Sequence, residues 1–222
     1  MTSRQVFNQI NRLTADFIST GLCDDQNFPS LTPGVDGFEE VSIGNIKSTA
    51  FLKNISYRDM YAILKSKRFY NFQMIDGALI LLQYRFLAKK IVTHRLSFFP
   101  SPDLAEFQNS PELYMADEIY ADILDKRVVT VPLRFDFDNR QDVPSPKDHP
   151  ISHLTIGQYE NCRIPVTSAI TPYHFLSFLL NNFYHTATLK FGNKLSYFDD
   201  KFCKEIFDED TMGIYINSPH TI

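Results

Sequence analysis

Residues 72–99 read FQMIDGALILLQYRFLAKKIVTHRLSFF, in which three apolar runs alternate with two turn signals. Asp76-Gly77 is typical of a tight hairpin turn, because both residue types readily adopt positive φ angles. A second chain reversal is expected at Lys89-Lys90, before the run that ends at Phe99. The three runs are therefore predicted to pair as an antiparallel meander.

Apolar periodicity and end signals outside this stretch predict further helices and strands. The expected helices span residues 3–21, 56–67, 110–126 and 171–185, followed by an acidic helix at 198–208. The expected strands span residues 50–53, 128–138, 152–156, 163–166 and 213–216. Residues 22–38 contain several Asp, Pro and Gly residues and are predicted to form a loop.

These elements predict an α+β fold, a mostly antiparallel sheet packed by helices on one face. The length of 222 residues fits one domain, 1–222, with residues 1–38 as an N-terminal helical arm and 39–222 as the body. The chain has 20 Phe and 11 Tyr, so we expect an aromatic core. It has few glycines and neither of the glycine-rich phosphate-loop motifs, which argues against a nucleotide fold of that kind.

Charge is unevenly distributed along the chain, although the net charge is only −4. Residues 65–95 hold seven basic residues and one acid, whereas residues 103–142 hold ten acids and four bases. This pattern fits either two solvated faces or a basic groove for a phosphate chain. Three widely spaced cysteines without a CxxC pair indicate reduced thiols, and no apolar run could span a bilayer. We therefore expect a cytoplasmic protein without a membrane partner.

Candidate site residues concentrate on two neighbouring strands of the expected sheet. Alternation along residues 128–138 puts Arg134, Asp136 and Asp138 on one face. His153 and Thr155 share a face of the next strand, and His149 ends the loop between the two strands. If the strands pair, these groups converge on one surface.

Three chemistries are compatible with this set of residues. Asp136, Asp138 and His153, with His149, could hold a divalent metal ion as a cofactor. Alternatively, His149 and His153 could cleave a phosphodiester as base and acid, while Arg134 stabilises the extra phosphate charge. Arg134 and Asp136 could also be a structural ion pair that orients a loop.

Further residues are candidates for binding the substrate. Arg163, Thr155 and the basic segment 65–95 are predicted to hold the substrate backbone. His94 and Arg95 are neighbours on one strand, so alternation sends them to opposite faces and only one of them can join a given site.

Several short motifs are distinctive: HRLSFFPSP (94–102), DEIYAD (117–122), RFDFD (134–138), HP (149–150) followed by SHL (152–154), CRIPV (162–166) and TP (171–172). Together they resemble an uncharacterised bacterial family, domain of unknown function 2290. The resemblance covers residues 72–184. It implies an intracellular bacterial protein in a mobile or defence-linked gene neighbourhood, and it brings no known activity.

The leading functional prediction is a phosphate-directed hydrolase or nuclease-like enzyme. Arg134, Asp136, His149 and His153 would be its catalytic residues. The Arg-x-Asp strand followed by a histidine-containing strand is also loosely similar to small bacterial toxins with RxD and HxH elements, although this chain has His153-Leu154-Thr155 in place of HxH. The alternatives are a non-enzymatic subunit that binds a partner protein and a regulator that binds nucleic acid.

Overall fold

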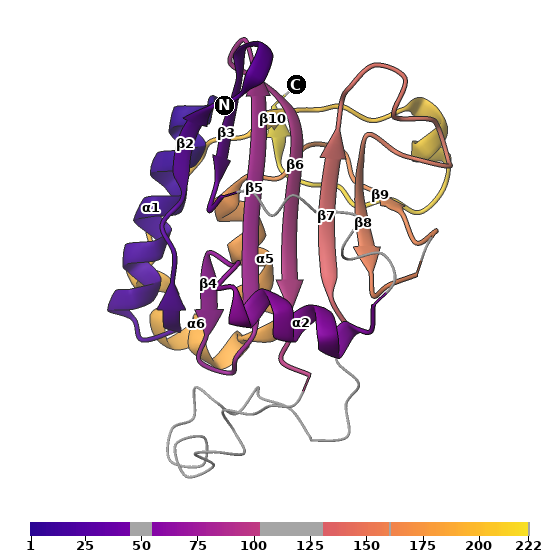
Figure 1. Ribbon diagram of the computed structural model, residues 1–222. Coiled ribbons are helices and arrows are strands. Elements are labelled where there is room, and N and C mark those ends of the chain that lie inside the picture. The colour runs from indigo at the N-terminus through magenta and orange to yellow at the C-terminus, as the bar shows by residue number, and fades with distance from the viewer. Residues whose placement is uncertain (45–54, 103–130, 160, 222) are drawn as a thin grey trace.

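The computed structural model describes residues 1–44, 55–102, 131–159 and 161–221, in which helices pack against a large sheet (Figure 1). Within these ranges the main sheet has nine strands, and every pairing in it is antiparallel. The strands are β1 (Cys23–Gln26), β2 (Ser30–Pro33), β3 (Phe38–Ser42), β4 (Phe72–Met74), β5 (Leu79–Leu87), β6 (Lys90–Phe99), β7 (Leu133–Asp138), β8 (Ser152–Ile156) and β9 (Ile164–Pro165). The predicted α+β fold is thus confirmed.

The order of strands is β1-β4-β5-β6-β7-β8-β9, and β3 joins β2 to the far end of β5. The hairpin at Asp76-Gly77 forms as expected, with Gly77 at φ 83° between β4 and β5. The next turn lies one residue earlier than predicted. Ala88 and Lys89 occupy it at φ 50° and 66°, so that Leu87 pairs with Lys90.

Helices begin where the sequence provides caps. α1 (Ser3–Ser19) is capped by Thr2, which bonds reciprocally with Gln5 as a capping box. α2 (Tyr57–Ser66) is capped by Ser56, and α5 (Pro172–Phe183) by Thr171. α5 ends before residue 185, and a separate helix α6 (His185–Phe191) follows.

The main hydrophobic core lies between one face of the sheet and the helices α1 and α5. Figure 1 shows α5 and α6 behind the sheet and α2 across the near face, at the lower end of the strands. Buried core residues include Val6, Ile10, Leu13 and Phe17 of α1, Phe135 and Phe137 of β7, and Phe175 and Leu179 of α5. A smaller cluster joins α2 to Leu79, Leu81 and Phe99 on the opposite face.

Polar contacts also tie α1 to segments that lie far along the chain. The Tyr173 amide of α5 donates to the Gln9 side chain at 3.0 Å. The Ser196 amide donates to the Asp16 carboxylate at 2.8 Å. The start of the chain is therefore held by its last quarter.

Two predicted elements are wrong. Residues 22–38 are not a plain loop but form β1, β2 and a short 3-10 turn, η1 (Val35–Gly37), because the edges of the sheet pair with them. Residues 198–208 do not form a helix. They run extended into β10 (Phe202–Cys203), which pairs in parallel with β11 (His220–Thr221), while the Asp200 carboxylate accepts bonds from Gln5 and Gln9 of α1.

The predicted strand at 213–216 is reduced to one bridge, in which Ile216 pairs with Val166. It follows a 3-10 helix, η5 (Asp208–Met212), and a second short 3-10 turn, η4 (Gly192–Lys194), follows α6. The predicted strand at 50–53, the helix at 110–126 and the start of the strand at 128–138 lie outside the described residues. In the described part of the chain, no helix is long and apolar enough to cross a membrane.

We expect the β5–β6 turn to limit stability, because two residues with a Cβ atom hold positive φ angles there. Replacing Ala88-Lys89 by Asn-Gly should raise the free energy of unfolding by about 1 kcal/mol. This corresponds to an increase in Tm of about 2–4 °C for a chain of this size. Thermal unfolding measures the change. Ala88→Val, which places a branched side chain at positive φ, should lower Tm, and an unchanged Tm in the Asn-Gly variant would contradict the argument.

Candidate functional site

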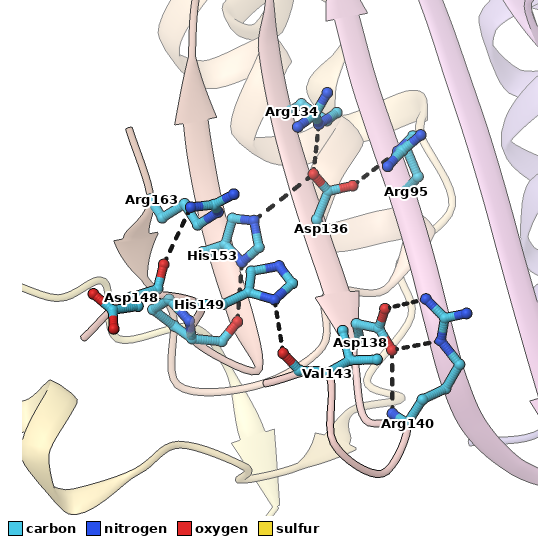
Figure 2. Close-up of polar contacts among 11 residues, drawn as sticks. Arg95, Arg134, Asp136, Asp138, Arg140, Val143, Asp148, His149, His153 and Arg163 are labelled. Atoms are coloured by element: carbon cyan, nitrogen blue, oxygen red, sulfur yellow. Dashed lines mark hydrogen bonds and ion pairs between the residues drawn. The ribbon is translucent and has the colours of Figure 1, made fainter. Parts of the chain in front are cut away.

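The register of β6, β7 and β8 brings polar side chains into rows on the face opposite α5. Arg95, Asp136 and His153 are directly opposed on the three strands. The next row comprises Ser97, Arg134 and Thr155. We call Arg95, Arg134, Asp136, His149 and His153 the Asp136 cluster (Figure 2).

Asp136 is the centre of this cluster. Its two carboxylate oxygens bind different arginines: Arg95 Nε donates to Oδ1 at 2.9 Å and Arg134 Nε donates to Oδ2 at 2.5 Å. Asp136 is buried, whereas the arginine side chains are 35% and 42% exposed. One buried carboxylate thus fixes two half-exposed guanidinium groups.

The environment of Asp136 keeps it ionised. Burial raises the pKa of its carboxyl group, but the charges of Arg95 and Arg134 together outweigh this effect and hold the pKa below 3.8. With Asp136 charged, the two arginines still leave an excess of one positive charge. The cluster is therefore suited to an anion rather than to a cation.

His153 lies against Asp136 with its proton on the far side of the ring. Its Nδ1 donates to the Pro150 carbonyl oxygen at 3.0 Å, since a carbonyl can only accept. Its Nε2 then carries a lone pair and lies 3.8 Å from Asp136 Oδ2. Burial lowers the pKa of His153 below 6.5, with smaller contributions from His149 and Arg163, so the ring is neutral at neutral pH.

His149 is the second imidazole of the cluster and is half-buried. Its Nδ1 donates to the Val143 carbonyl oxygen at 3.1 Å. The second ring nitrogen, Nε2, is therefore the atom of His149 that is left to transfer a proton. The rings of His149 and His153 have centroids 5.2 Å apart. Two imidazoles, each oriented by a backbone carbonyl, therefore lie side by side.

The loop that carries His149 is tied down at three points. Ser145 and His149 form a bridge, and Arg163 donates to the Asp148 carbonyl oxygen at 3.2 Å. The Lys147 amide donates to the buried Asp210 carboxylate at 2.7 Å. Sequence reasoning missed Asp210, because nothing local in η5 indicates a contact with a loop 63 residues earlier.

Other predicted site residues fall in different places. Thr155 shares the polar face, and its buried Oγ1 has no hydrogen-bond partner among the described residues; the same holds for Ser97 Oγ, which was not predicted. Arg163 lies beside the His153 ring (Figure 2). His94 is not part of the cluster.

His94 points into the core. Its ring stacks on Phe137 with centroids 5.7 Å apart, and its Nε2 accepts from the Ile170 amide at 2.9 Å. Burial lowers the pKa of His94 to about 3, so it stays neutral. The alternation that brings Arg95 to the polar face therefore makes His94 a core residue, and its predicted contact with substrate lacks a structural basis.

The predicted metal ligands are not arranged to hold an ion together. Asp138 binds Arg140 through both carboxylate oxygens, at 2.9 and 2.6 Å, and Asp136 is engaged by its two arginines. Across the described ranges, no group of three or more His, Cys, Asp or Glu residues is arranged to hold a metal ion. The donor set of the cluster thus fits a divalent cation poorly.

The basic segment 65–95 is dispersed over the fold. Arg68 pairs with Asp25 at the β1 edge, and Lys89 lies in the β5–β6 turn. Arg85 pairs with Glu40 and lies 4.0 Å from the centre of the Phe38 ring. Arg85 and Arg95 are the members of the segment that the register puts on the polar face of β5 and β6.

Asp136→Asn should lower the free energy of unfolding at neutral pH by about 2 kcal/mol, because it removes a buried charged acceptor of two bonds. The folded pKa of Asp136 lies below its unfolded value, so this stabilisation is present above the unfolded pKa and is lost as pH falls through the folded pKa. Denaturant unfolding should therefore separate the variant from wild type at neutral pH, and the difference should shrink well below pH 3.8.

Asp138→Asn is the matched control, since its partner Arg140 is half-exposed. Its expected loss is less than 1 kcal/mol. Equal losses in the two variants, or a pH-independent loss in Asp136→Asn, would argue against this account of the cluster.

The comparisons with known proteins agree with the resemblance of the motifs. The model of the family described as "Uncharacterized conserved protein (DUF2290)" matches residues 22–218, which include every residue of the Asp136 cluster. No curated protein and no solved structure matches the chain. Because the family model spans most of its length, the chain belongs to the DUF2290 family of uncharacterized conserved proteins.

Proposed function

We propose that this protein is a phosphate-directed hydrolase of the nuclease type, with the Asp136 cluster as its site. The observation that carries the proposal is the carboxylate of Asp136 held between Arg95 and Arg134. Guanidinium groups bind phosphate oxygens in a fork geometry, and fixed cations stabilise the charge that develops on a transferring phosphoryl group.

In this proposal the two arginines bind the phosphate. Both contact Asp136 through Nε, and their side chains are more than a third exposed. Their outer nitrogens, Nη1 and Nη2, can therefore donate to an anion while Asp136 holds the stems in place. Arg163 adds a third positive charge next to His153.

The imidazoles transfer protons. The neutral His153 accepts a proton at Nε2 from the attacking hydroxyl group or water, and His149, which acts in its doubly protonated form, gives its Nε2 proton to the leaving oxygen. The Pro150 and Val143 carbonyls fix the two rings so that Nε2 is the working atom in each. The roles predicted from the sequence for Arg134, His149 and His153 are kept, while Asp136 orients arginines in place of a metal ion.

The proposal includes a cytoplasmic setting, in keeping with the free thiols of Cys23, Cys162 and Cys203. The proposal also includes a defence-linked role, which rests on the family resemblance alone.

A nucleic-acid-binding regulator without catalysis is the second candidate. The observation that favours it is the burial of His153, whose side chain is only 3% exposed. An imidazole so enclosed can also act as a structural support for Asp136. Such a regulator would bind a phosphate chain with strong salt dependence and would release it unchanged.

The test is cleavage of labelled RNA and DNA oligonucleotides, single-stranded and duplex, in the presence of EDTA. Wild type should cleave at least one of them, and His149→Gln and Arg134→Lys should each lower the rate at least about 100-fold at a temperature where the variant is still folded. His185→Gln, at the exposed start of α6, and Arg12→Gln, on α1, are the matched controls and should keep full activity. Turnover that survives in His149→Gln, or no cleavage by wild type, would refute the proposal.

The pH dependence of cleavage tests the role of His153. Because burial lowers its pKa, the neutral form that accepts a proton persists below pH 6.5. The acidic limb of kcat/KM should therefore lie below pH 6.5, where protonation of Nε2 removes the lone pair. A limb at or above that value would show that His153 is not the base.

A further inference from the structure

The polar face carries arginines along a diagonal, which we call the arginine stripe: Arg85 of β5, Arg95 of β6 and Arg134 of β7. Arg85 is opposite Thr93, Arg95 is opposite Gln83, and Arg134 is opposite Ser97. Each step therefore moves one strand across and two residues along. By strand geometry this is about 4.8 Å across and about 7 Å along.

Such a stripe suits a chain of phosphates better than a single anion. The three arginines share two carboxylates: Glu40 pairs with Arg85, and Asp136 is shared by Arg95 and Arg134. One positive charge therefore remains in excess, at the Asp136 end of the stripe. Arg163, two residues before Pro165, lies by alternation on the same face and is level with Thr155 and Arg134, so it adds a positive charge beside the stripe. A positively charged track of this kind follows a nucleic-acid backbone.

An exposed aromatic residue lies four positions before Arg163 in the chain. Tyr159 belongs to the connection between β8 and β9 and is 73% exposed. Its ring is held over Gly157, where an added Cβ would lie 3.3 Å from the ring. Bases of a single strand stack on aromatic side chains of this type, whereas the bases of a duplex are already stacked on one another.

Unused hydroxyl groups flank Arg134 in the same row. Ser97 Oγ and Thr155 Oγ1 belong to residues that are 1% and 7% exposed, and neither has a hydrogen-bond partner within the described residues. Buried hydroxyls normally find partners. Both hydroxyls lie beside Arg134, in the row that carries the proposed phosphate site.

We propose that the ligand of this face is a single-stranded nucleic acid, whose phosphates follow the arginine stripe towards Arg163 and whose base stacks on Tyr159. The inference rests on the proposed phosphate-directed site and names its substrate class. RNA and DNA share the required backbone charge and bases, so the test includes both.

The experiment is fluorescence anisotropy with labelled oligo-U and oligo-dT of about ten nucleotides, within the usual site size for such tracks. A duplex of equal length is measured beside them, all in EDTA and at several salt concentrations. Single strands should bind more tightly than the duplex, and Tyr159→Ala should weaken their binding about tenfold. Tyr159→Phe should restore binding, because the ring is kept.

Two controls make the result specific. Tyr197→Ala removes a ring that is also 73% exposed but packs on Tyr173 of α5, and it should bind like wild type. Arg85→Gln, outside the Asp136 cluster, should weaken binding and lower the slope of log Kd against log salt by about 0.7. Tighter binding of oligo-U than of oligo-dT would identify RNA as the ligand. Equal binding of the two would show that the site accepts both RNA and DNA.

The inference is overturned if the duplex binds as tightly as the single strands, or if Tyr159→Ala behaves like Tyr197→Ala. Failure of this inference can be distinguished from failure of the proposed hydrolase function. Oligonucleotides that bind in the expected pattern but are never cleaved uphold the inference and refute the catalytic function. Cleavage at the same rate by wild type and by Tyr159→Ala would uphold the catalytic function and refute the inference.

Discussion

The alternation of side chains across β6, β7 and β8 is the constraint on which the rest of the structure depends. The three strands are in register, so Phe135 and Phe137 enter the core while Arg134 and Asp136 face the other way. A slip of one residue would exchange the two faces and bury the charges against α5. The free-energy cost of burying these charges therefore fixes the register. The same pattern of residues therefore builds the core and assembles the polar rows.

The polar rows in turn depend on the balance of charge at Asp136. Taking a carboxylate out of water is unfavourable, and two guanidinium groups offset that cost only if they stay in contact with it. The arrangement therefore restrains Arg95 and Arg134 as strongly as it stabilises Asp136. A restrained arginine loses less conformational freedom when it binds an anion, which favours recognition at this face.

The parts of the molecule that follow from local pattern could be predicted from the sequence. The meander, the β7–β8 pair and the capped helices α2 and α5 each have a period or a turn signal of their own. Alternation also predicted the convergence of Arg134, Asp136, His153 and Thr155, and the separation of His94 from Arg95. The β1 and β2 strands escaped notice because they owe their extended form to pairing with the sheet edge and not to alternation.

Contacts between distant segments could not be predicted from the sequence for the same reason. The acid-rich segment 198–208 has the composition of a helix, but Asp200 accepts bonds from α1 and Phe202 is buried, which favours the extended form. Asp210 reaches the His149 loop with no local signal. The metal hypothesis took Asp136 and Asp138 as ligands of one ion. In the structure each carboxylate is paired with arginine instead. Strand alternation alone does not indicate which arginine pairs with which carboxylate.

The bonds between α1 and the last quarter of the chain bear on the order of events during synthesis. Gln9 meets Tyr173 across 164 residues, and Asp16 meets Ser196 across 180. At the usual pace of a ribosome, about 10 to 30 seconds separate the emergence of the two partners. Throughout that interval the apolar stripe of α1 lacks the surface of α5 that covers it. The packing of α1 can therefore be completed only after most of the chain has been synthesised.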